Sequence, residues 1–77
     1  MPTHLEYLDP DRNRFRFYHL EIQPTLFGGW SLVRQWGRIG TWGRLAVSCF
    51  DTRAKAEEAT ARLISAKCRR GYTVVAE

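Results

Sequence analysis

The tripeptide Trp-Gly-Arg occurs twice in this 77-residue chain, as Trp36-Gly37-Arg38 and, six residues on, as Trp42-Gly43-Arg44. A tryptophan offers an apolar, π-rich face that can cover a sugar or an exposed base, with stacking worth roughly 1–3 kcal/mol. An arginine presents a planar fork of donors that binds phosphate bidentately, and a glycine lets the backbone approach a ligand closely. The residue types of this motif are therefore suited to binding nucleic acid.

The positive charge of the chain is concentrated around these tripeptides. Ten of the twelve basic residues are arginines, the net charge is +4 and the isoelectric point is near 9.6. Residues 12–44 carry six arginines against one acidic residue, whereas residues 1–11 have a net charge of −3 and residues 45–77 one of +2. This balance favours an anionic partner such as nucleic acid.

Each residue of the motif also has an interpretation that needs no ligand. Trp36 is either a core residue, because tryptophan is heavily buried on average, or an exposed stacking surface. Trp42, which falls in a predicted turn, is either exposed without a function or a second stacking surface. Arg34 and Arg38 either bind a ligand or belong to a solvated basic face. The residues alone leave these alternatives open.

The chain lacks the residue patterns that an enzyme needs. It contains no Ser/His/Asp or Cys/His constellation, no paired-carboxylate motif and no phosphate loop, which predicts a non-enzymatic binding module. His4 and His19 have no partner at the spacing of metal ligands or of a triad, so we expect them to be surface or sheet residues. Neither a cofactor nor a metal is predicted.

The cysteines and the N-terminal residues bear on the location of the protein. Cys49 and Cys68 form neither a CxxC pair nor metal-ligand spacing with a histidine, which favours two reduced, packed thiols in a cytoplasmic protein. The first residues lack the basic and apolar regions of a signal peptide, and the longest apolar runs are three or four residues. We therefore expect a cytoplasmic protein with no membrane partner.

Segments rich in aromatic and branched residues predict the strands that must position the motif. They are residues 14–22, 30–36 and 44–50, with 4–8 and 72–75 as short additional strands. Alternation puts Trp36 on the same face as Leu32 and Arg34 in one strand, and Tyr18 on the same face as Leu20 in another. Glycines before and after the strand of Trp36 predict tight turns there.

Residues 53–70 predict one helix. Apolar side chains recur at helical spacing from Ala56 to Ala66. Asp51 or Thr52 can cap the start of the helix, and Gly71 suits the left-handed position after its last turn. The predicted fold is α+β, a small antiparallel sheet with one helix packed on one face, in a single domain of residues 1–77.

The segment 33–41, Val-Arg-Gln-Trp-Gly-Arg-Ile-Gly-Thr, resembles the signature of the WGR domain, a nucleic-acid-sensing module of poly(ADP-ribose) polymerases. The resemblance extends over residues 5–76. It includes the upstream strand with Phe17-Tyr18-His19-Leu20 and the downstream Phe50-Asp51-Thr52 that leads into an Ala-rich helix. Relatives often carry Asn and Trp near the position of Gly71, where this chain has Arg69 and Arg70.

The resemblance implies a role for each signature residue. In the family, the tryptophan packs on the sugar at the 5′ end of a broken strand and the arginine bridges towards DNA, which assigns these roles to Trp36 and Arg38. The predicted nucleic-acid-binding residues are Trp36, Gly37, Arg38, Arg34, Arg44 and Trp42. The second copy, Trp42-Gly43-Arg44, falls in a turn that varies in the family and is interpreted as a coincidence.

Two functions from different classes follow. The first is a module that binds DNA, with RNA as the other candidate, at ends, nicks or single-stranded junctions. The alternative is a protein-interaction module that docks onto a separately encoded enzyme, with Trp36 and Arg38 as anchors. Composition does not separate them, because tryptophan and arginine are also the favoured residues of protein–protein hot spots.

Overall fold

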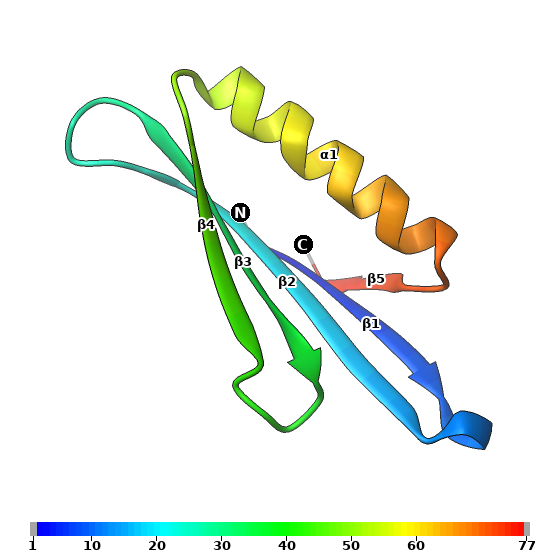
Figure 1. The fold of residues 1–77 in the computed structure, drawn as a ribbon. Coiled ribbons are helices and arrows are strands. Elements are labelled where there is room, and N and C mark those ends of the chain that lie inside the picture. Colours follow the sequence, from blue (N-terminus) through cyan, green and yellow to red (C-terminus); the bar gives the residue numbers. More distant parts are fainter. Residues whose placement is uncertain (1, 77) are drawn as a thin grey trace.

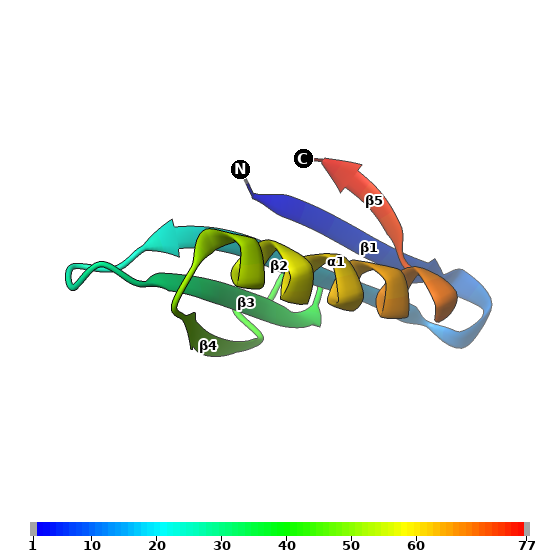
Figure 2. The ribbon, with the colours of Figure 1, turned by 90° about the horizontal axis from the view of Figure 1, so that it is seen from above.

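The computed structural model describes residues 2–76, which form one sheet and one long helix (Figure 1). The elements in chain order are β1 (Thr3–Asp9), the short 3-10 helix η1 (Pro10–Arg12), β2 (Arg14–Pro24), β3 (Trp30–Arg38), β4 (Arg44–Phe50), α1 (Arg53–Arg69) and β5 (Thr73–Ala76). The sheet is antiparallel, with strand order β4-β3-β2-β1-β5. In Figures 1 and 2, α1 runs along one face of the sheet. The predicted α+β fold is confirmed.

The core lies between α1 and the face of the sheet that carries Tyr18 and Leu20. These two side chains are buried with Leu5 of β1 and Leu32 of β3. They share one face because successive strand side chains point to opposite sides and the strands pair with Leu5 opposite Tyr18. From α1, Ala56 is fully buried and Ala59, Leu63 and Ile64 pack against this cluster. The apolar alternation therefore selects the face that the helix covers.

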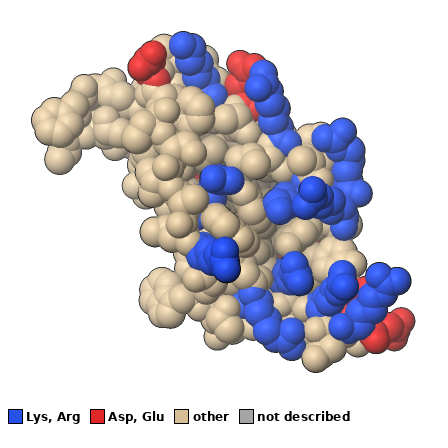
Figure 3. Space-filling model, viewed as in Figure 1, with Lys and Arg blue, Asp and Glu red and all other residues tan. Residues whose placement is uncertain are grey.

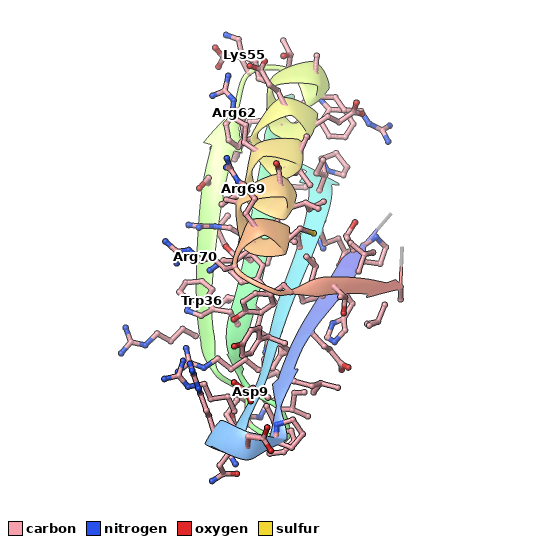
Figure 4. All side chains as sticks on the ribbon, turned by 90° about the vertical axis from the view of Figure 1, so that its right-hand side faces the viewer. Asp9, Trp36, Lys55, Arg62, Arg69 and Arg70 are labelled. Atoms are coloured by element: carbon pink, nitrogen blue, oxygen red, sulfur yellow. The ribbon has the colours of Figure 1, made fainter. Side chains whose placement is uncertain are left out.

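The ends of α1 follow from their local chemistry. Thr52 is the N-cap, and its hydroxyl accepts a hydrogen bond from the Lys55 N–H at 3.2 Å. At the other end, Gly71 has a φ of +103° and returns the chain to the sheet, where β5 pairs with β1. The end of α1, marked by its C-cap Arg70, lies near the middle of the molecule (Figure 4).

Two expectations from the sequence can be compared with the structure. His4 and His19 are strand residues, as expected, but they also contact one another as cross-strand neighbours in the β1–β2 pair, with their Nδ1 atoms 3.2 Å apart. The two histidines are fifteen residues apart in the sequence. Their contact depends on the register of the β1–β2 hairpin and therefore cannot be read from their spacing. Cys49 and Cys68 are exposed, which corrects the expectation that they are packed. Cys49 lies on the face of the edge strand β4 that α1 leaves open.

Within residues 2–76, the second face of the sheet has no helix over it (Figure 2). The structure contains, among the same residues, no helical segment with the length and apolarity that crossing a membrane requires.

Candidate nucleic-acid interface

Strand pairing brings the signature tryptophan beside the basic start of β2. Trp36 is the cross-strand partner of Tyr18, and Arg38 is the partner of Arg16, two residues earlier on β2. Arg14 and Arg16 alternate with Tyr18 on the strand, so all three point to the face that α1 covers. The C-terminal end of α1 stops short of this part of the sheet, which leaves Trp36 between the helix end, marked by Arg70, and the sheet end, marked by Asp9 (Figure 4).

Two adjoining hollows lie at this place. One, of about 250 Å³, is lined by Asn13, Arg14, Arg16, Trp36, Gly37, Arg38 and Tyr72. The other, of about 230 Å³, is lined by Tyr7, Arg14, Arg16, Lys67, Arg70 and Tyr72. Because they share three lining residues, we treat them together and call them the basic cleft. Its lining residues include five cations and three aromatic rings and no acidic side chain.

The surface around the cleft is basic as well. On the face shown in Figure 3, Lys and Arg side chains gather along α1 and over the end of the sheet below it, whereas the acidic side chains in view lie near the top and the lower right. Exposed cations in such an arrangement attract an anion over several ångströms and lose strength as salt is added.

Trp36 belongs to both the core and the cleft. Its ring is half-buried, packs against the core cluster and stacks on Tyr18 with the ring centroids 5.9 Å apart and an interplanar angle of 24°. It also lines the larger hollow. The alternatives of a core residue and an exposed stacking surface are thus not exclusive, because the Tyr18 ring can hold the indole in place while the rest of the ring remains accessible.

Arg34 supports Trp36 from the side and lines neither hollow. Its guanidinium carbon lies 5.6 Å from the Trp36 ring centroid, and its Nη1 donates a hydrogen bond to the Tyr18 hydroxyl at 3.3 Å. Its buried Nε atom has no hydrogen-bond partner among the described residues. This geometry makes Arg34 a residue that positions the stacked rings.

Arg38 is held by the turn that precedes β2. Its Nη1 and Nη2 donate hydrogen bonds to the backbone oxygen and the Oδ1 atom of Asn13, at 3.1 and 3.2 Å, and its guanidinium lies over the Phe15 ring. Asn13 has a φ of +53°, a left-handed conformation that asparagine tolerates well. A guanidinium has five N–H donors, so Arg38 keeps three for a ligand while its position is fixed.

Lys67 joins the cleft from α1. Its ammonium lies 4.6 Å from the Tyr18 ring centroid and 5.5 Å from that of Tyr72. Desolvation by burial, followed by the positive charges of nearby arginines, lowers the pKa of Lys67 below its usual 10.5. These arginines are Arg70, Arg34 and Arg16. Several cations held this close repel one another, so a bound anion would relieve an unfavourable interaction.

The second Trp-Gly-Arg copy lies beside the first but lines no part of the cleft. Trp42 is 84% exposed in the β3–β4 turn, and Arg44 is exposed opposite Trp36. Gly43, with a φ of +69°, packs directly on the backbone of the first copy.

The larger part of the cleft was not predicted from the sequence, namely Arg14, Arg16, Lys67, Arg70 and the two tyrosines Tyr7 and Tyr72. Only the strand alternation of Arg14 and Arg16 with Tyr18 hinted at it.

Comparison with known proteins identifies the family. The model of the WGR domain matches residues 1–77. The uncharacterized protein y4dW of Sinorhizobium fredii is 44% identical over 69 residues, which are 90% of this chain and 34% of that protein. The chain thus spans about a third of this relative. A crystallised protein from Bacteroides fragilis has the same fold, with a TM-score of 0.83 and 24% identity over 99% of this chain and 20% of its own.

The chain belongs to the WGR domain family. Membership supports a nucleic-acid-binding or polymerase-associated module in general, and the WGR domain is a non-catalytic module.

Proposed function

We propose that this WGR domain binds nucleic acid where a strand ends, at breaks, nicks or single-stranded junctions, with the terminal nucleotide in the basic cleft. The observation that carries the proposal is the cleft itself: a half-buried indole beside five cations, with no acidic side chain among the lining residues. An aromatic surface next to a positive groove is the arrangement by which proteins hold an unpaired strand.

The aromatic and the basic residues that line the cleft would bind different parts of the nucleotide. Trp36, fixed by Tyr18, would cover the sugar or base at the terminus, which is accessible only where stacking is interrupted. Arg14, Arg16 and Arg38 would bind phosphate oxygens, a contact that positions the strand without reading its sequence. A continuous duplex offers phosphates but no free sugar face, so preference for ends depends on Trp36 and general affinity on the arginines.

We favour DNA as the partner and treat RNA as an outcome of the test. The lining residues bind phosphate, sugar or base faces, which both nucleic acids present.

A protein partner, such as a separately encoded enzyme, is the second candidate function, and one observation favours it. Leu26 and Phe27, at the tip of the β2–β3 connection, are 96% and 97% exposed. Two adjacent large apolar side chains at a protruding tip are suited to insertion into a partner. Leu26 and Phe27 do not line the basic cleft. The two functions are therefore compatible, and substitutions at the tip and in the cleft can test them separately.

A binding titration tests the proposed function. Nicked, blunt-ended, single-stranded and closed-circular DNA, and the same single strand as RNA, are each titrated at about 50 and 200 mM salt. We expect tighter binding to every substrate that has a strand end, and a steep loss of affinity at the higher salt, because bound arginines release condensed counterions. Equal affinity for closed-circular and nicked DNA would remove the preference for ends.

A further inference from the structure

The open face of the sheet, opposite α1 and the basic cleft, carries a pair of histidines that the proposed function does not use. His4 and His19 are cross-strand partners on β1 and β2. Because each is next to a buried residue of the core face, Leu5 and Leu20 respectively, both side chains point to the other face. Their rings have centroids 5.4 Å apart and are tilted by 53°.

The two imidazoles converge through the same kind of atom. The Nδ1 atom of His4 lies 3.2 Å from the Nδ1 atom of His19. Two nitrogens that bind one tetrahedral Zn²⁺ at about 2.0–2.1 Å are separated by about 3.3–3.4 Å. The observed spacing is therefore within about 0.2 Å of that of a metal chelate.

The surroundings of His4 resemble those of a metal ligand. The Nε2 atom of His4 lies 3.4 Å from the Oε2 atom of Glu6, and the two side chains are 31% and 30% exposed. Metal-binding histidines commonly donate their second ring N–H to a carboxylate, which fixes the tautomer and strengthens the ligand. With its proton on Nε2, His4 presents the Nδ1 lone pair towards His19. The Phe17 ring is stacked with the His4 ring, with centroids 6.1 Å apart and an interplanar angle of 10°.

We propose that His4 and His19 bind one divalent transition-metal ion, with Zn²⁺ as the ion expected at neutral pH, through their Nδ1 atoms. Imidazole nitrogens suit zinc. On binding, His19 carries its proton on Nε2, so each ring stays neutral. Among residues 2–76, no group of three or more potential metal ligands gathers at one place. The remaining coordination positions belong to water or to a ligand from another molecule, which makes this an exchangeable site.

A bound ion would cross-link β1 to β2 and so stabilise the pairing of these two strands. It lies on the face opposite the basic cleft, so zinc binding and nucleic-acid binding can be measured separately. Failure of one proposal does not affect the other.

A titration with ZnCl₂, followed by calorimetry and by NMR of the histidine rings, tests the proposal. Because exposed thiols also bind zinc, the titration uses the chain with Cys49→Ser and Cys68→Ser. We expect binding to saturate at one equivalent, with shifts confined to the two imidazoles and their neighbours. His4→Asn and His19→Asn should each weaken binding at least tenfold, and Glu6→Gln about tenfold, the usual effect of losing such a carboxylate.

Glu21→Gln is the matched control. It removes the same charge from the same face of the sheet, on β2 two residues from His19, and should leave the zinc affinity unchanged. Far-UV circular dichroism confirms that each variant is folded. The absence of saturable zinc binding, or equal affinity in the parent and in both histidine variants, would overturn the site. An equal loss in Glu6→Gln and Glu21→Gln would overturn the role of the Glu6 contact.

Discussion

Gly43 lies so close to Trp36 that a Cβ atom on Gly43 would be 2.0 Å from the Trp36 carbonyl oxygen. The same imaginary atom would be 3.2 Å from the Cα atom of Gly37, and one on Gly37 would be 2.7 Å from the Cα atom of Gly43. The two Trp-Gly-Arg copies are thus in backbone contact across the β3–β4 turn. Both glycines are needed for this approach. The requirement for glycine at position 37 is therefore explained by packing within the chain itself, without a ligand.

The first prediction follows from this contact. Gly43→Ala should destabilise the domain clearly more than Gly40→Ala, measured by chemical denaturation. Both glycines have a positive φ, +69° and +91°, so both substitutions carry the left-handed penalty of about 1–2 kcal/mol. Only at Gly43 does the added methyl group also meet backbone atoms, because nothing lies within 4 Å at Gly40. Equal losses would mean that the turn can move away from Trp36 at little cost.

The second prediction concerns the phosphate contacts of the cleft. Arg14→Gln and Arg16→Gln should each weaken binding to all DNA substrates and reduce the slope of log affinity against log salt by about 1, the change expected for one lost phosphate contact. Arg62→Gln is the control, since it removes the same charge from an exposed position of α1 that pairs with Glu58. A slope that falls equally in all three variants would indicate a diffuse charge effect rather than contacts in the cleft.

The helix and the strands could be predicted from the sequence more accurately than the contacts between side chains of different elements. Alternation placed Tyr18 and Leu20 on one face, which in the structure is the core face, and the helix begins at the predicted residue, with Thr52 rather than Asp51 as its cap. These features depend on neighbours within a few positions, which a local pattern contains. The three main strands begin where predicted, and β2 and β3 each extend two residues further.

The cleft could not be derived in this way. Its composition depends on the β2–β3 register, which sets Arg16 opposite Arg38, and on the packing of α1 on the sheet, which brings Lys67 over Tyr18. Register is fixed by turn geometry, so a shift of one residue would have given a different site from the same local patterns. For the same reason the contact between His4 and His19 was not foreseen.

The third prediction is a pH dependence from Lys67. Its pKa is lowered from 10.5, mainly by desolvation. The ammonium attracts phosphate only while it is protonated, so its contribution to binding is present at neutral pH and is lost as pH rises through the lowered pKa. For a single-stranded oligonucleotide, affinity should therefore begin to fall at a lower pH than for an ordinary lysine. Lys67→Arg, which stays charged, should remove this fall. Identical pH profiles would exclude Lys67 from the site.

The last prediction compares the two tryptophans. Trp36→Ala should abolish the preference for nicked over closed-circular DNA by removing a stack worth roughly 1–3 kcal/mol. Trp42→Ala should change binding little, because the Trp42 side chain is 84% exposed and lines no part of the cleft.

Stability must be measured beside affinity in both variants. Trp36 packs on Tyr18 and the core, so its truncation also costs folding free energy, up to the roughly 3–5 kcal/mol of a fully buried tryptophan. Trp36→Phe is the second variant, since it keeps an aromatic ring against Tyr18 and should remain folded with a reduced preference for ends. A folded Trp36 variant that distinguishes ends as well as the parent would show that Trp36 is not the sensor. Loss of the preference in Trp42→Ala would instead assign the function to the second copy.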